Sequence, residues 1–214
     1  MFNNRSHLSA ILFAVLLTNC DSATLQVRGF PGLAVTVNCK PGGTIARYTD
    51  EQGRFPGERG PADSAFHFAL LSTVGEPPLA CGSRNQTAYR LVRTLALDPL
   101  DLVVHVSREE SAYRATVATY NRETKRVNKS ELTLDEAKWR RIEAALNALD
   151  FWNQPANEMP SPKRGGHLDG GWLALEGYAE NHYHVVLRPA SNDRLSSSAQ
   201  VFFDTLNLQL QQFR

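Results

Sequence analysis

This chain has few cysteines and methionines, and it lacks an excess of charge of either sign. Its 214 residues include three cysteines and two methionines, and 23 Lys and Arg side chains stand against 22 Asp and Glu. A charge so close to balance gives no electrostatic reason to expect a nucleic acid as partner. Because no CxxC pair occurs, cysteine-based metal sites are disfavoured, and we expect neither a metal nor a cofactor.

Long apolar runs are also rare, but one lies at the N-terminus. Leu8–Leu17 is almost entirely apolar and follows the positive charge of Arg5. The run is too short for a helix across a bilayer, which needs about 20 residues. A short basic start followed by such a run is typical of a secretory signal. We therefore expect residues 1–19 to be a signal peptide and residues 20–214 to form one domain.

The apolar run ends in Leu17-Thr18-Asn19-Cys20, which resembles the lipobox of bacterial lipoproteins. In that family a Leu three residues before a Cys precedes cleavage, and the Cys receives a diacylglyceryl group. The resemblance implies that Cys20 is the lipidated first residue of a periplasm-facing protein anchored in the cell envelope. Asn19 stands where the lipobox usually has Gly, Ala or Ser, so a soluble periplasmic or secreted protein is the alternative.

Lipidation of Cys20 would leave Cys39 and Cys81 as a pair in an oxidising compartment. A disulfide between them would close a long loop and stabilise the fold by roughly 4 kcal/mol in the chain-entropy model. Two separate buried thiols are the alternative.

Residues 20–99 carry strand-like patterns separated by turn signals. The strand-type runs are Leu33–Cys39, Phe66–Val74 and Thr87–Leu97, and they are rich in β-branched or aromatic residues. We predict a strand at each, and hence a mostly β segment.

Residues 100–214 predict the order hairpin, helix, hairpin, helix. Apolar residues alternate from Leu102 to about Tyr120 around a polar turn, and a polar loop follows at Asn121–Glu131. Four basic residues cluster within that loop, and we interpret the loop as solvated. They are Arg122, Lys125, Arg126 and Lys129.

The helix predicted for Thr133–Trp152 is the clearest element in the chain. Its apolar residues recur at helical spacing, and Thr133 and Glu136 match a capping box. The apolar stripe that we expect in the core consists of Trp139, Ile142, Leu146 and Leu149.

A second hairpin and a second helix complete the pattern. Gly171–Tyr178 and His182–Pro189 predict the hairpin, and Ser196–Phe213 predicts an amphipathic helix. We therefore expect an α+β fold, in which two amphipathic helices pack on one face of an antiparallel sheet built from hairpins. Asn153–Gly171 has no periodicity and predicts either a functional loop or a bare linker.

The second hairpin also carries a resemblance. Leu168–Gly177, LDGGWLALEG, and then Tyr183–Arg188, YHVVLR, resemble a recurrent pattern of uncharacterised bacterial lipoproteins. In these proteins a helix ending in Phe-Trp precedes the hairpin, as Phe151-Trp152 does here. The resemblance covers about residues 130–190 and the export signal. It supports the envelope location and implies no activity.

The same hairpin supplies the candidate site. His182 and His184 would share a strand face, and Asp169 and Glu176 come from the partner strand and its approach, so together they could bind a divalent metal or transfer protons. A register shift of one residue would put Glu176 on the opposite face from both histidines. A polar network of Glu176, His184 and Arg188 on an exposed sheet face is the competing interpretation. The candidate binding residues are Asp169, Trp172, Glu176, His182, His184 and Arg188.

Two functions follow from these patterns. The first is a non-catalytic, membrane-anchored module that binds an envelope protein or a small ligand through the exposed sheet face or the Asn153–Gly171 loop. The alternative is an envelope hydrolase or metal-dependent enzyme centred on Asp169, Glu176, His182 and His184. The chain has no G-x-S-x-G motif that would mark a serine nucleophile.

Overall fold

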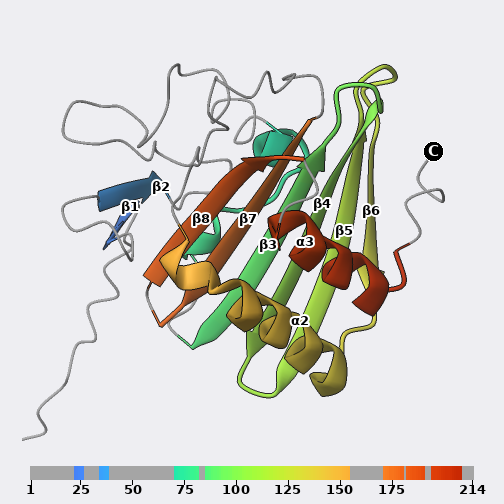
Figure 1. The fold of residues 1–214 in the computed structure, drawn as a ribbon. Helices are drawn as coiled ribbons and strands as arrows, with labels where there is room; N and C mark the ends of the chain where they lie inside the picture. Colours follow the sequence, from blue (N-terminus) through green and yellow to red (C-terminus); the bar gives the residue numbers. More distant parts are fainter. Residues whose placement is uncertain are drawn as a thin grey trace, which may run out of the picture.

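A six-stranded antiparallel sheet with two helices on one face dominates the computed structural model (Figure 1). This is the α+β arrangement that the sequence predicts. Among the residues that the structure describes, no helix is long and apolar enough to cross a bilayer. Those residues are 22–26, 34–38, 70–81, 85–154, 171–180, 182–190 and 194–208.

The sheet has the strand order β6-β5-β4-β3-β7-β8, and β1 pairs with β2 in a separate two-stranded sheet. The strand β3 therefore lies between a meander formed by β4, β5 and β6 and the hairpin of β7 and β8. The strands are β1 (Ser22–Gln26), β2 (Ala34–Asn38), β3 (Gln86–Thr94), β4 (Leu100–Glu109), β5 (Ala112–Asn121), β6 (Val127–Leu132), β7 (Trp172–Ala179) and β8 (His182–Pro189). The helices are α2 (Glu136–Leu149), α3 (Arg194–Thr205) and the short 3-10 helices η1 (Leu79–Cys81) and η2 (Phe151–Asn153).

The strand predicted for Phe66–Val74 is wrong over its described part. Residues 70–73 are helical, and Val74 N donates to Leu70 O at 2.9 Å. Leu70, Leu71 and Val74 are buried together, at the one- and four-residue spacing of a helix. A short apolar run does not by itself distinguish a buried helical turn from a strand.

The polar loop predicted at Asn121–Glu131 is correct only for residues 122–126, because residues 127–131 belong to the edge strand β6. All but the last residue of β6 are exposed. Side chains of an edge strand that reach solvent on both faces have no need to alternate, and Lys and Glu there discourage pairing with another chain. The sequence of this strand therefore looks like a loop.

The helix α2 buries the predicted stripe but begins differently. Asp135 is its N-cap and accepts a hydrogen bond from Lys138 N through Oδ1 at 2.8 Å. The predicted capping box of Thr133 and Glu136 is therefore wrong, because Glu136 is already the first helical residue. The helix ends at Asp150, which has the left-handed conformation with φ 56°.

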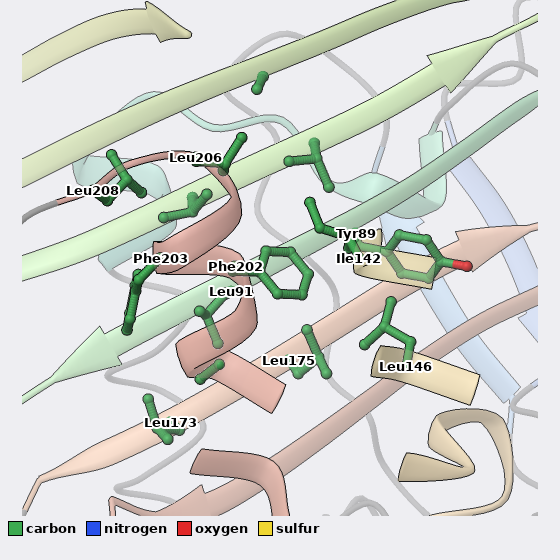
Figure 2. Packing of buried hydrophobic residues seen from close by; sticks show 14 of the residues in the cluster. Tyr89, Leu91, Ile142, Leu146, Leu173, Leu175, Phe202, Phe203, Leu206 and Leu208 are labelled. Carbon is green, nitrogen blue, oxygen red and sulfur yellow. The ribbon is translucent and has the colours of Figure 1, made fainter. Parts of the chain in front are cut away.

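The main core fills the space between the helices and the sheet (Figure 2). Phe202 of α3 and Ile142 and Leu146 of α2 pack in one cluster with Leu91 of β3 and Leu175 of β7. On the opposite face a smaller cluster joins residues 70–74 to apolar side chains of β3, β4, β5, β7 and β8. Both faces of the sheet are therefore covered over its central strands, including the one expected to be exposed.

Candidate functional site

The register of the second hairpin decides whether the predicted cluster can form. Glu176 pairs with Val185, Gly177 pairs with His184, and Ala179 pairs with His182. Directly opposed residues share a face of the sheet. Glu176 therefore lies on one face, and His182 and His184 lie on the other. The sheet itself separates Glu176 from both histidines.

The remaining candidate residues are also dispersed. His182 is exposed at the start of β8, whereas Arg188 is buried on the same face. Trp172 is half-buried on the face of Glu176, and Asp169 lies outside the described residues. The expected network of Glu176, His184 and Arg188 on an exposed face is wrong, because Glu176 and His184 are both 0% exposed on opposite faces. Within the described part of the chain, no three His, Cys, Asp or Glu side chains are grouped to hold a metal.

His184 belongs to the aromatic end of the helix layer. Its ring centroid lies 5.0 Å from that of Phe151 and 6.2 Å from that of Trp152. Its neighbour Gly177 makes room for them, since a Cβ there would lie 2.5 Å from Phe151 Cε1 and 3.2 Å from Trp152 Cη2. Phe151 and Trp152 of η2, which follows α2, thus pack on the second hairpin.

The face of Glu176 holds a different arrangement, which sequence patterns did not predict. Successive register pairs join side chains of β6, β5, β4, β3 and β7 in one line across the strands. We call this line the polar row. It consists of Glu131, Thr116, His105, Arg90 and Glu176.

A buried ion pair forms one end of the polar row. Arg90 Nε donates to Glu176 Oε1 at 2.9 Å, and Arg90 Nη2 donates to Glu176 Oε2 at 2.6 Å. Tyr183 donates its hydroxyl to the same Oε2 at 2.6 Å. Burial by itself would lower the pKa of Arg90, but the charge of Glu176 and its hydrogen bonds raise it instead. Arg90 therefore stays charged inside the protein.

Glu76 connects the polar row to the segment that covers it. Its Oε2 lies 3.1 Å from His105 Nδ1 and 3.9 Å from Arg90 Nη1, and its Oε1 lies 3.2 Å from Lys129 Nζ. Burial raises the pKa of Glu76, but the hydrogen bond and charge of His105, together with the charges of Arg90 and Lys129, outweigh burial and lower it. The carboxylate is held ionised by basic side chains from three strands.

Two of these basic side chains also bind the backbone on either side of Glu76. Arg90 Nη1 donates to Pro77 O at 2.7 Å, and Lys129 Nζ donates to Gly75 O at 3.3 Å. Residues 75–77, which we call the strap, are therefore fastened to β3 and β6 through main chain as well as side chain. The strap thus lies against Arg90 and His105 of the polar row.

Exposure divides the row into two halves. The side chains of Arg90 and Glu176 are fully buried. By contrast, 18% of the His105 side chain is exposed, Thr116 is half-buried and Glu131 is exposed. His105 Nε2 has no hydrogen-bond partner among the described residues. An imidazole oriented by a carboxylate is the arrangement of a general base, but no nucleophile in the described part of the chain is hydrogen-bonded to it.

A second buried carboxylate lies at the start of β4. The side chain of Asp101 is 0% exposed, and its Oδ1 lies 3.5 Å from Arg122 Nε. Burial raises the pKa of Asp101 to about 6; Arg122 opposes this shift, and Asp98 adds to it. Asp101 is thus protonated more easily near neutral pH than an ordinary aspartate.

No family model, curated protein or solved structure matches the chain. Its function therefore has to follow from its own residues and geometry. Sequence did contain a signal for the ion pair, since Arg90 and Glu176 are charges inside apolar strand-type runs. It contained none for Glu76, which lies in an ordinary Gly-Glu-Pro-Pro turn.

Proposed function

We propose that this chain is a non-catalytic binding module, which a lipid at Cys20 holds to the bacterial cell envelope on the periplasmic side. The N-terminal apolar run and the lipobox-like Leu17–Cys20 support the anchor. The observation that carries the binding proposal is the division of the polar row. The charged groups of its buried half have hydrogen-bond partners within the protein, and the side chains of its other half are accessible to solvent.

The buried half is suited to holding structure. A reacting group has to reach its substrate, whereas Arg90 and Glu176 are enclosed and bind each other, Tyr183 and the strap. A paired, fully hydrogen-bonded buried charge is also costly to disturb. These residues therefore organise the face on which a partner binds.

The accessible half is suited to a polar protein surface. Thr116 and Glu131 belong to the row, Lys129 is 44% exposed beside it, and Arg114 is exposed on the neighbouring strand. Side chains of both charges stand here on the paired strands β5 and β6. We propose an envelope protein as the partner, with opposite charges across the contact.

We also propose the disulfide between Cys39 and Cys81. Cys39 lies outside the described residues, but β2 ends one residue before it, at Asn38. Its partner strand β1 lies against η1, which ends at Cys81. These neighbours support a bridge without any large movement of the chain.

The anchor is tested by metabolic labelling with a radioactive fatty acid. The wild-type protein should take up label and remain with membranes, and Cys20→Ser should lose both properties. Thr24→Ser, close to Cys20 in the chain, is the matched control and should keep them. An unlabelled wild-type protein would refute the anchor without bearing on the binding surface.

The binding surface is tested by a photo-crosslinking amino acid at position 116 in living cells. A discrete cross-linked product is expected there, and none from the same group at position 140, on the exposed side of α2. Glu131→Lys should reduce the yield severalfold. The absence of a product at both 116 and 131 would refute this surface.

A stoichiometric metal that is lost in His184→Ala would refute the non-catalytic assignment.

A further inference from the structure

Two turns at one end of the sheet are joined into a single unit (Figure 1). They are the β3–β4 turn, residues 95–99, and the β5–β6 turn, residues 122–126. Arg122 N donates to Pro99 O at 2.8 Å, and Arg122 Nη2 donates to the carbonyls of Leu95 and Asp98. We call the joined turns the turn pair.

The turn pair is well ordered by its own hydrogen bonds. Asn121 Oδ1 accepts from Glu123 N at 2.9 Å and from Thr124 N at 2.8 Å, and Lys125 N donates to Asn121 O at 2.8 Å. In the other turn, Leu100 N donates to Asp98 Oδ1 at 3.1 Å. The side chains at the tips are therefore presented on a fixed backbone.

The composition of these tips is unusual for a solvated turn. Leu97 is 96% exposed and Val127 is 38% exposed, and they are the two exposed large hydrophobic residues in the part of the chain that the structure describes. Both lie at this end of the sheet, Leu97 in the β3–β4 turn and Val127 directly after the β5–β6 turn. Lys125 and Arg126 are exposed there, with Glu123 as the one acid of that turn.

We propose that the turn pair is a second membrane contact, which docks on a bilayer containing anionic phospholipid. Leu97 and Val127 enter the interfacial region, and Lys125 and Arg126 lie against lipid phosphates. Each basic residue near such a surface strengthens binding about fivefold. The inference rests on the proposed anchor, because a tether makes so weak a second contact effective. With two contacts the domain would no longer rotate freely about its tether, and the polar row would keep a fixed orientation relative to the membrane.

The test supplies the tether artificially, so that a failure of lipidation and a failure of the turn pair are distinguishable. The chain from Asp21 onward contains every described element and is attached through an N-terminal histidine tag to vesicles with nickel-chelating lipid. An environment-sensitive fluorescent amino acid occupies position 97, or position 140 on α2 as the matched control. Vesicles consist of phosphatidylcholine alone or with about 30% phosphatidylglycerol.

On the anionic vesicles the probe at position 97 should shift to the blue and be quenched by spin-labelled lipid, and the probe at position 140 should do neither. Lys125→Glu with Arg126→Glu should reduce the quenching at least about threefold, whereas Arg140→Glu with Arg141→Glu should leave it unchanged. No blue shift at position 97 on tethered protein would overturn the proposal. Equal quenching at positions 97 and 140 would overturn it as well, because the tether alone would then explain the contact.

Discussion

Arg90 and Glu176 form a two-pronged ion pair in the middle of the sheet, and neither side chain is exposed. They are 86 residues apart in the chain, on neighbouring strands. Each carries a full charge that water no longer solvates, so each depends on the other. The pair ties the second hairpin to β3 and positions the guanidinium that also holds the strap.

Removing one partner of this pair should be strongly destabilising. We expect Arg90→Met to lower the free energy of unfolding by about 3–5 kcal/mol, because Glu176 is left as an unpaired buried charge. The double variant Arg90→Met/Glu176→Leu should recover much of that loss. Urea denaturation measures both. The exposed pair of Glu136 and Arg140 is the matched control, and its removal should change stability by less than about 0.5 kcal/mol. An additive double variant would contradict the prediction.

Glu76→Gln should loosen the strap and do so in a pH-dependent way. The folded pKa of Glu76 is below its ordinary 4.5, so its carboxylate stabilises the fold above that value and loses its effect as the pH falls through the folded pKa. At pH 7 we expect a loss of about 1–2 kcal/mol and faster hydrogen exchange in residues 74–78. The difference from wild type should shrink in acid. Glu131→Gln, exposed in the same row, is the control; a pH-independent difference would count against this account.

Asp101 should have the opposite pH dependence. Its folded pKa of about 6 is above its ordinary 3.8, so between these values the folded protein binds more protons than the unfolded chain. Stability therefore falls as the pH rises from about 4 to 6, by up to about 1.4 kcal/mol per pKa unit. Asp101→Asn should flatten this part of the profile, which denaturant titrations from pH 4 to 7 measure. The same slope in both proteins would show that Asp101 is not its source.

The N-terminus of α2 offers a direct comparison of two capping residues. Asp135→Ala should cost about 1 kcal/mol, because its carboxylate accepts from Lys138 N. Thr133→Ala should change stability by no more than about 0.5 kcal/mol, since Thr133 is exposed and precedes the cap. Thermal unfolding of the two variants tests this. A larger effect at Thr133 would restore the capping box that the sequence suggested.

Sequence patterns predicted the structural features that depend mainly on residues close together in the chain. The stripe from Trp139 to Leu149 is buried as expected, because helical periodicity places those residues on one face whatever surrounds them. The edge strand β6 escaped prediction because both of its faces are exposed. The two helices on one face of an antiparallel sheet followed from the order of the elements.

The geometry of the site depends on the register and order of the strands, which the sequence of one strand does not determine. Whether Glu176 shares a face with His184 is decided by the hairpin register, and a shift of one residue reverses the answer. The partnership of Glu176 with Arg90 depends on β7 joining the sheet beside β3 rather than beside β6. The charges were visible in the sequence, but their partners were not.

The central position of β3 has a consequence for the way the chain is made. One edge of β3 pairs with the adjacent β4. Its other edge stays unpaired until β7 is present, and β7 begins 78 residues after β3 ends. A chain that emerges from its N-terminus therefore exposes an apolar, unpaired central strand for the whole of that interval. Such open edges invite association with other chains. The newly made protein should need shielding until its last fifth has emerged, and truncation before residue 172 should yield aggregates rather than a smaller folded sheet.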